Sequence, residues 1–164
     1  MSSSKHRISG EIQYIFSTLF HFFAMNLPNS SMKRIFYRLR GSKIGAHVDF
    51  SYGVFLEEHY PECITIQDNV DIGPCVIIVA HDSSLKCLSS GGTLITKKVI
   101  IEENAYIGAG VLILPGVRIG HHSLIGAGSV VTRDIPPNSV AFGNPACVQG
   151  TVDEWLRKKE VRRT

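Results

Sequence analysis

The chain has 164 residues, a size typical of one domain, and its hydrophobic content of 44% is ample for a buried core. A net charge of +3 is too mild to require a nucleic-acid partner, although it suits an anionic ligand such as a phosphorylated cofactor. The four cysteines lie far apart with no CxxC pair, which argues against a zinc site or a disulfide framework and indicates free thiols in a reducing cytosol: Cys63, Cys75, Cys87 and Cys147.

Residues 1–43 predict a helical cap made of two helices. The first is an apolar run from Ile12 to Met25, which is too short and too polar to span a membrane. The run also lacks the small-residue cleavage site of a signal peptide. We therefore expect a cytoplasmic protein that is soluble or peripheral to a membrane.

The second predicted helix follows a break at NLPNS and covers SSMKRIFYRLRG, with Ser30 or Ser31 as its N-cap and Gly41 at its end. An apolar stripe lies opposite a basic one in this helix: Met32, Ile35, Phe36 and Leu39 against Lys33, Arg34, Arg38 and Arg40. Such a helix can lie on an anionic membrane. Alternatively, both helices cover the open end of the domain that follows, where strand edges and apolar interior must be hidden. The two interpretations are compatible.

A six-residue repeat begins at Ile44 and is clearest over residues 101–131. Large aliphatic residues recur at one position of each unit: Ile101, Ile107, Ile113, Ile119, Ile125 and Val131. The fifth position of each unit is small: Ala105, Val111, Val117, Ser123 and Ser129. A period of six fits neither a helix nor a simple strand, so each unit is a short strand plus a corner. The corners fall at residues that tolerate positive φ, together with glycines directly after the aliphatic position: Asn104, Gly110, Gly116, His122 and Gly128, with Gly108, Gly120 and Gly126. The repeat predicts an all-β solenoid, a parallel β-helix.

Two interruptions break the repeat. The first, LEEHYPEC, holds Glu57, Glu58 and Tyr60, and the second is a loop inserted at 81–98. A long insertion in a solenoid is either a functional element or a tolerated surface loop. His81 stands where the regular coil gives way to this loop, a good position for acid–base chemistry, although a single histidine is more often structural.

The segment TRDIPPNSVAFGNPACVQG is expected to leave the coil after Val131, within a β-helix domain of residues 44–149. Residues 150–164 predict a C-terminal helix capped by Thr151, with Asp153 and Glu154 in its first turn. Its basic residues either form a solvated face or contact a phosphate.

The repeat segments ITIQDNVDIGPCVIIVAHD and IIEENAYIGAGVLILPGVRIGHHSLIGAGSVVTRDIPPNSVAFGNPA closely resemble the hexapeptide-repeat acyltransferases, especially the maltose, galactoside and polysaccharide O-acetyltransferase branch. The N-terminal helical pair looks more like members that modify cell-surface polysaccharide precursors. The resemblance implies a left-handed parallel β-helix in which residues eighteen apart stack. It also implies a homotrimer with active sites between subunits and direct acetyl transfer from acetyl-CoA to a sugar-type hydroxyl acceptor, without metal or nucleic acid. His81 matches the catalytic histidine and would act as general base.

Expected acyl-CoA contacts also follow from the resemblance: Tyr106, Gly108, Ala109, Gly126, Ala127, Thr132 and Arg133, with the small residues leaving space for the pantetheine arm. Two positions depart from the family. Cys147 stands where a basic residue is frequent, so a cation among Arg157 to Lys159 is expected to serve the CoA phosphates. Gly53 replaces an asparagine that binds the acceptor sugar, so Glu57, Glu58 and Tyr60 are expected to supply acceptor contacts.

Two other functions are compatible with a β-helix of this kind. A γ-class carbonic anhydrase shares this fold but needs His81 plus two later histidines five residues apart, whereas His121 and His122 are adjacent. A non-catalytic scaffold trimer would keep the solenoid without its chemistry.

Overall fold

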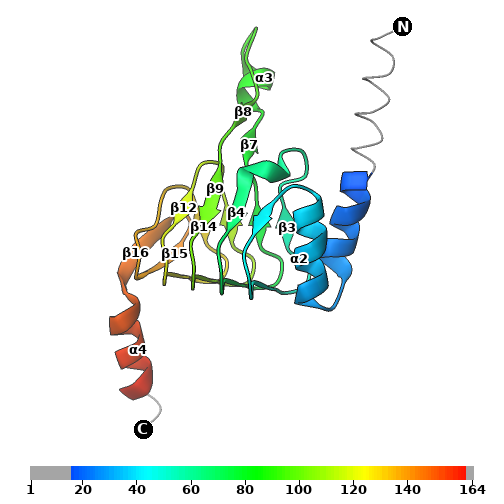
Figure 1. Ribbon diagram of the computed structural model, residues 1–164. Helices are drawn as coiled ribbons and strands as arrows, with labels where there is room; N and C mark the ends of the chain where they lie inside the picture. Colours follow the sequence, from blue (N-terminus) through cyan, green and yellow to red (C-terminus); the bar gives the residue numbers. More distant parts are fainter. Residues whose placement is uncertain (1–15, 162–164) are drawn as a thin grey trace, which may run out of the picture.

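The computed structural model describes residues 16–161, and its centre is a stack of coils with three sheets as faces, parallel throughout except for the last strand of one sheet (Figure 1). Sheet A holds β1 (Lys43–Ile44), β4 (Ile64–Ile66), β9 (Val99–Ile101) and β12 (Arg118–Ile119). Sheet B holds β2 (Asp49–Phe50), β5 (Asp71–Ile72), β10 (Tyr106–Ile107), β13 (Leu124–Ile125), β15 (Ser139–Gly143) and β16 (Ala146–Thr151). Sheet C holds β3 (Phe55–Leu56), β6 (Ile77–Ile78), β11 (Leu112–Ile113) and β14 (Val130–Val131). The chain visits the three sheets in turn, as expected for a parallel β-helix.

The register of the strands follows the six-residue repeat. Ile119 pairs with Ile101, and Val131 pairs with Ile113, so residues eighteen apart stack as expected. The aliphatic and small positions of residues 101–131 are all buried. The expected corner residues have positive φ between 57° and 88°: Asn104, Gly110, Gly116, His122 and Gly128.

The other repeat glycines have a different role from the one expected. Gly108, Gly120 and Gly126 are not among the residues with positive φ. A Cβ at Gly108 would lie 2.6 Å from the amide nitrogen of Ala127 on the next coil, far inside contact distance. Coil stacking therefore requires these glycines, because only a residue without a side chain permits such a close approach.

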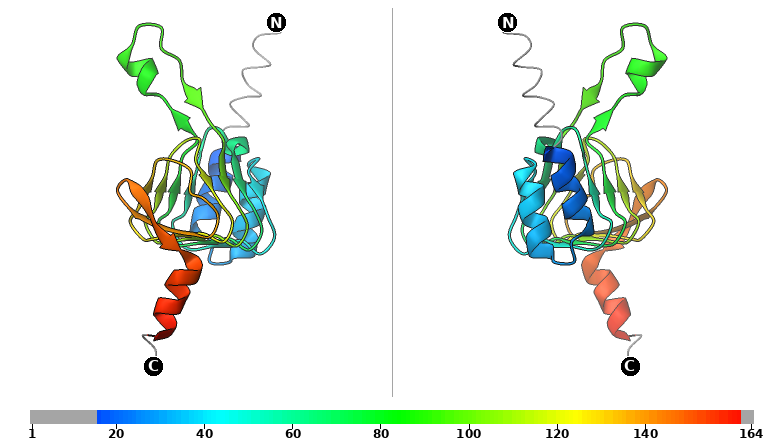
Figure 2. Two further views of the ribbon diagram at one scale, coloured as in Figure 1. Left: turned by 90° about the vertical axis from the view of Figure 1, so that its left-hand side faces the viewer. Right: turned by 90° about the vertical axis from the view of Figure 1, so that its right-hand side faces the viewer.

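Two helices cover the open end of the first coil (Figures 1 and 2): an N-terminal helix, described over residues 16–26, and α2 (Ser30–Leu39). The N-cap of α2 is Asn29, one residue earlier than expected, because its side-chain oxygen accepts from the N–H groups of Ser31 and Met32. Gly41 follows the helix with φ 112°, as the predicted stop requires. Neither these helices nor any other in residues 16–161 combines the length and apolar character needed to cross a bilayer.

The basic side of α2 faces the coils. Strand edges of the first coil leave backbone carbonyls without a neighbouring strand, and four basic side chains and Tyr37 donate to them. Lys33 Nζ, for example, donates to Phe50 O at 3.2 Å and to Ser51 O at 2.6 Å, and Tyr37 Oη donates to Val54 O at 2.6 Å. The cap thus closes the solenoid by hydrogen bonds as well as by the apolar contacts of Ala24 and Tyr37, which are fully buried in the core.

The inserted loop is an arm that projects from the coil stack (Figure 2). Its base is an antiparallel pair, β7 (His81–Asp82) with β8 (Ile95–Thr96), and its tip carries α3 (Ser84–Leu88). The first interruption contains a short 3₁₀ turn, Pro61–Cys63. All four cysteines are free, as predicted.

The coil continues beyond Val131, contrary to expectation. Ile135 bridges Ile119, and Ala141 of β15 pairs with Ile125, so both residues extend the buried stack. The six-residue spacing is broken here, because the next inward aliphatic residue, Ile135, comes four residues after Val131, just before Pro136. β15 then pairs antiparallel with β16, which leads into α4 (Val152–Val161). Thr151 and Glu154 cap α4 reciprocally, each backbone N–H donating to the other side chain at 3.2 Å.

Candidate active site

His81 lies where the coil gives way to the arm. It follows the buried Ala80 and begins β7, so its backbone is anchored on both sides. The preceding coil brings Glu57 alongside, because Leu56 is in register with Ile78 and the Glu57 N–H donates to the Ile78 carbonyl. The side chain of His81 is 28% exposed and that of Glu57 only 1% exposed. A partly exposed imidazole therefore rests on a buried carboxylate.

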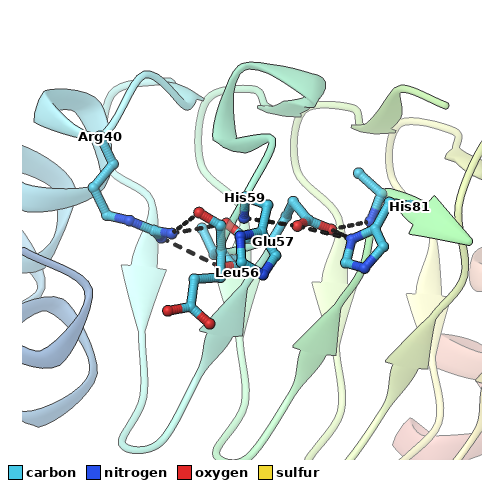
Figure 3. A network of polar contacts seen from close by, with 7 residues as sticks. Arg40, Leu56, Glu57, His59 and His81 are labelled. Atoms are coloured by element: carbon cyan, nitrogen blue, oxygen red, sulfur yellow. Dashed lines mark hydrogen bonds and ion pairs between the residues drawn. The ribbon is translucent and has the colours of Figure 1, made fainter. Parts of the chain in front are cut away.

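The Glu57 carboxylate is surrounded by donors (Figure 3). His81 Nδ1 lies 2.8 Å from Oε2 and 3.0 Å from Oε1. Oε2 also accepts from the Ala80 N–H at 2.8 Å, and Oε1 accepts from the His59 N–H at 2.9 Å. Burial by itself raises the pKa of this carboxyl, but the hydrogen bonds from Ala80, His81 and His59 outweigh it and hold the pKa below its ordinary value. Glu57 is therefore ionised at neutral pH.

An ionised partner at Nδ1 fixes the state of the imidazole. Nδ1 must carry the hydrogen that the carboxylate accepts, which leaves the lone pair of neutral His81 on Nε2, on the other side of the ring (Figure 3). Such a ring can take a proton at Nε2, and Glu57 stabilises the imidazolium that results. We expected Glu57 to contact an acceptor. In the structure its carboxylate is buried and bonded to His81, a geometry that suits positioning of the imidazole.

The cap holds the backbone that carries Glu57. Arg40, at the end of α2, is 7% exposed, and its guanidinium donates to three consecutive carbonyls (Figure 3). Nη1 lies 3.2 Å from Leu56 O, and Nη2 lies 2.8 Å from Glu57 O and 3.1 Å from Glu58 O. The cap and the His81 site are thus coupled through one buried side chain.

Two aromatic rings of the first interruption flank the imidazole. The ring centroids of His59 and Tyr60 lie 5.9 Å and 5.8 Å from that of His81. Glu58 turns toward the cap, where Oε1 accepts from Thr18 Oγ1 at 3.5 Å. His59 was not among the predicted site residues. The only sequence signal for it was its position in the first interruption of the repeat.

A cleft of about 310 Å³ opens between the cap and this interruption. Its lining is mixed, with apolar side chains from the helices and polar ones mainly from the interruption: Phe16, Ser17, Phe20, Leu39, Arg40, Glu58, His59, Pro61 and Glu62.

Comparisons with known proteins agree with the six-residue repeat. The six-repeat model of bacterial hexapeptide transferases matches residues 98–133. A galactoside O-acetyltransferase of Lactococcus lactis is 43% identical over 120 residues, so the match covers 67% of this chain but only 56% of that protein. A galactoside O-acetyltransferase of Escherichia coli is 35% identical over 156 residues, which cover 90% of this chain and 73% of that protein. The chain belongs to the hexapeptide-repeat acyltransferase family. Among solved structures, a maltose O-acetyltransferase from Clostridium difficile matches with a TM-score of 0.66 and 29% identity, over 87% of this chain and 85% of that one.

In this hexapeptide-repeat chain the expected acyl-CoA residues divide between two edges of the coil stack. Tyr106, 45% exposed, lies on sheet B, and Gly108 with Ala109 follows it at the edge between sheets B and C. Gly126 and Ala127 stack on the same edge, one coil further on. Thr132 and Arg133 instead follow β14, at the edge between sheets C and A that also carries His81. Within one chain these residues do not gather around one site.

The remaining candidates lie elsewhere. Cys147 is exposed in β16, and Arg157 to Lys159 lie in α4, at the end of the coil stack opposite the cap (Figure 1). His121 and His122 follow β12 at the third edge, between sheets A and B. In residues 16–161 no three His, Cys, Asp or Glu side chains are grouped to hold a metal ion.

Proposed function

We propose that this chain is an acetyl-CoA-dependent O-acetyltransferase that modifies a hydroxyl of a sugar or polysaccharide precursor. The observation that carries the proposal is the imidazole of His81, held at Nδ1 by the buried, ionised Glu57, with Nε2 on the opposite side of the ring. The galactoside and maltose O-acetyltransferases among the relatives support the reaction class. The four free thiols suit the expected cytoplasmic location.

His81 acts as the general base in this proposal. The acceptor hydroxyl oxygen attacks the thioester carbonyl carbon of acetyl-CoA while its proton passes to Nε2. The tetrahedral intermediate then breaks its carbon–sulfur bond, and the proton moves from Nε2 to the departing sulfur. The products are an O-acetyl ester and free coenzyme A, with no acyl-enzyme and no role for a cysteine. A positioned base of this kind typically contributes about 10² to 10⁴ in rate.

The proposed active unit is a homotrimer of left-handed coils, as in the family. The division of the acyl-CoA residues between two edges supports assembly. If the edge that carries Tyr106, Ala109 and Ala127 in one copy faces the edge that carries His81 and Arg133 in the next, both sets line one groove. Arg133 is exposed, and its planar guanidinium suits a phosphate of CoA.

The proposed acceptor site lies on the cap side of His81. Tyr60 and His59 flank the imidazole, and Glu58 lies at the cleft next to them. Carboxylates and phenol groups hydrogen-bond sugar hydroxyls readily, so Glu58 and Tyr60 remain the proposed acceptor contacts.

Acetyl transfer tests the proposal directly. The full chain is incubated with acetyl-CoA and a panel of sugars, nucleotide sugars and polysaccharide fragments. Release of the CoA thiol is followed with a chromogenic thiol reagent, and each product is analysed by mass spectrometry. We expect acceptor-dependent thiol release together with one added acetyl group. Tight acetyl-CoA binding without transfer to any acceptor would favour a scaffold instead, and carbon dioxide hydration by a metal-loaded trimer would favour the carbonic anhydrase alternative.

A further inference from the structure

The outer surface of the cap is an apolar face. Seven of the sixteen exposed large hydrophobic side chains among residues 16–161 lie on the two cap helices, and they are between 39% and 61% exposed. We call these residues the cap face: Phe16, Leu19, Phe22, Phe23, Met32, Ile35 and Leu39. Both helices run across the end of the coil stack, so the cap face points away from the solenoid (Figures 1 and 2).

The exposed apolar side chains of α2 are not explained by packing against the core. A surface helix normally turns its apolar stripe toward the core. In α2 three residues of the stripe are exposed, Met32, Ile35 and Leu39, because the inner side holds the donors that satisfy carbonyls of the first coil. Lys33 and Arg40 on that inner side are 2% and 7% exposed, whereas Ile35 and Leu39 are 54% and 60% exposed. Phe36 joins the two helices by packing between Phe20 and Phe23. The cap is therefore closed on its inner side and offers its outer side to a partner.

The charge of the cap indicates which partner. Residues 16–48 contain five Lys and Arg and no Asp or Glu. The whole chain has seventeen Lys and Arg and fourteen Asp and Glu. The residues outside 16–48 therefore contain twelve basic and fourteen acidic side chains. Positive charge is thus concentrated at the apolar end of the molecule. Lys43, in β1 next to α2, is exposed and can meet anionic groups, whereas Arg38 donates to the carbonyls of Ile44 and Gly45. A second copy would bring the same positive charge, which disfavours cap-to-cap pairing.

We propose that the cap face docks on an anionic lipid bilayer, with both helices lying in the plane of the interface. Phenylalanine and leucine side chains enter the boundary between headgroups and acyl chains, and the exposed Lys43 meets the headgroups. The sequence predicted that the second helix can lie on an anionic membrane, and the proposed surface joins the N-terminal helix to it.

Docking would also place the cleft at the membrane surface. Phe16 and Leu39 belong both to the cap face and to the cleft wall, and His59 of the cleft lies against His81. The proposal does not depend on acetyl transfer, because binding to vesicles is measured without any substrate.

Vesicle flotation of the full chain tests the docking. The vesicles consist of phosphatidylcholine alone or of phosphatidylcholine mixed with phosphatidylglycerol. We expect binding to the mixed vesicles that weakens at high salt, and little binding to phosphatidylcholine alone. The variant Leu19→Gln/Phe22→Gln/Ile35→Gln should lose at least about tenfold in partitioning, because it removes three apolar side chains from the interface. The matched control Leu85→Gln/Leu88→Gln/Leu156→Gln changes three exposed leucines away from the cap and should bind like the parent chain.

A fluorescent variant keeps the test decisive if the triple variant fails to fold. Trp155→Phe removes the single tryptophan, and Phe22→Trp places one on the cap face. Its emission should shift to the blue with the mixed vesicles. The proposal is overturned if the unmodified chain does not float, if the cap variant floats equally well, or if the tryptophan emission is unchanged. It is also overturned if sedimentation without lipid shows that the cap variant dissociates a larger assembly, because the cap face would then join copies of the chain.

Discussion

His21 should make the stability of the folded chain fall sharply in mild acid. Its side chain is 6% exposed on the inner side of the N-terminal helix, and in residues 16–161 neither ring nitrogen has a hydrogen-bond partner. Its ring packs edge-on against Phe55, at 4.8 Å between centroids, and near Tyr37. Burial, assisted by the nearby charge of Arg40, lowers the pKa of His21 from 6.5 to about 4.

The sign of the effect follows from proton binding. Between pH 6.5 and 4 the unfolded chain binds a proton at this histidine that the folded chain does not, so lowering the pH favours unfolding. A pKa difference of this size removes about 2 kcal/mol of unfolding free energy between pH 7.5 and 5, and up to about 3 kcal/mol below pH 4.

Urea unfolding at fixed protein concentration measures this effect at pH 7.5, 6 and 5, which cover the upper part of the window between the two pKa values. His21→Phe keeps the aromatic contacts and removes the titrating ring. From pH 7.5 to pH 5 the parent chain should therefore lose about 2 kcal/mol more unfolding free energy than this variant. His121→Gln alters an exposed histidine and should follow the parent chain. Parallel stability curves for the parent chain and His21→Phe would refute the reasoning.

Three further predictions concern the site, the cap and the coils. Glu57→Gln should lower kcat at least about tenfold while the KM for acetyl-CoA stays near its original value, since the neutral amide has one acceptor oxygen instead of two and does not stabilise an imidazolium. Unchanged kcat in steady-state assays would exclude a positioning role. Lys33→Met should cost about 1 to 3 kcal/mol in urea unfolding, because the Ser51 carbonyl loses the Lys33 donor and the Phe50 carbonyl keeps only the 3.4 Å bond from Ser30 Oγ. The exposed Lys43→Met is its control and should change stability little. Gly108→Ala should destabilise the fold by about 2 kcal/mol or more, because its Cβ would meet the backbone of Ala127, and a stability equal to that of the parent would contradict the stacking role.

The coil could be predicted from the sequence because its cause is local and periodic. Each unit repeats an inward aliphatic residue, a corner residue and a small inward residue. Ile101, Asn104 and Ala105 hold these three positions in one unit. Where the period slips, the prediction failed. Ile135 and Ala141 continue the stack two residues out of phase, directly around a pair of prolines that mask the repeat.

The pairing of Glu57 with His81 could not be predicted because it depends on how two coils stack. The residues are 24 apart, and the interruption between them changes the length of the coil that separates them. The orientation of α2 was hidden for a similar reason. Its sequence contains a basic side and an apolar side, but only the open carbonyls of the first coil decide which side turns inward.

His81→Ala tests the central claim most directly when acetyl transfer and acetyl-CoA binding are measured on the same preparation. The proposed general base predicts that transfer falls by at least about 100-fold while the Kd for acetyl-CoA stays within a few fold of the parent value. Transfer at the parent rate by a variant that still binds acetyl-CoA would contradict the assignment of His81 as the base.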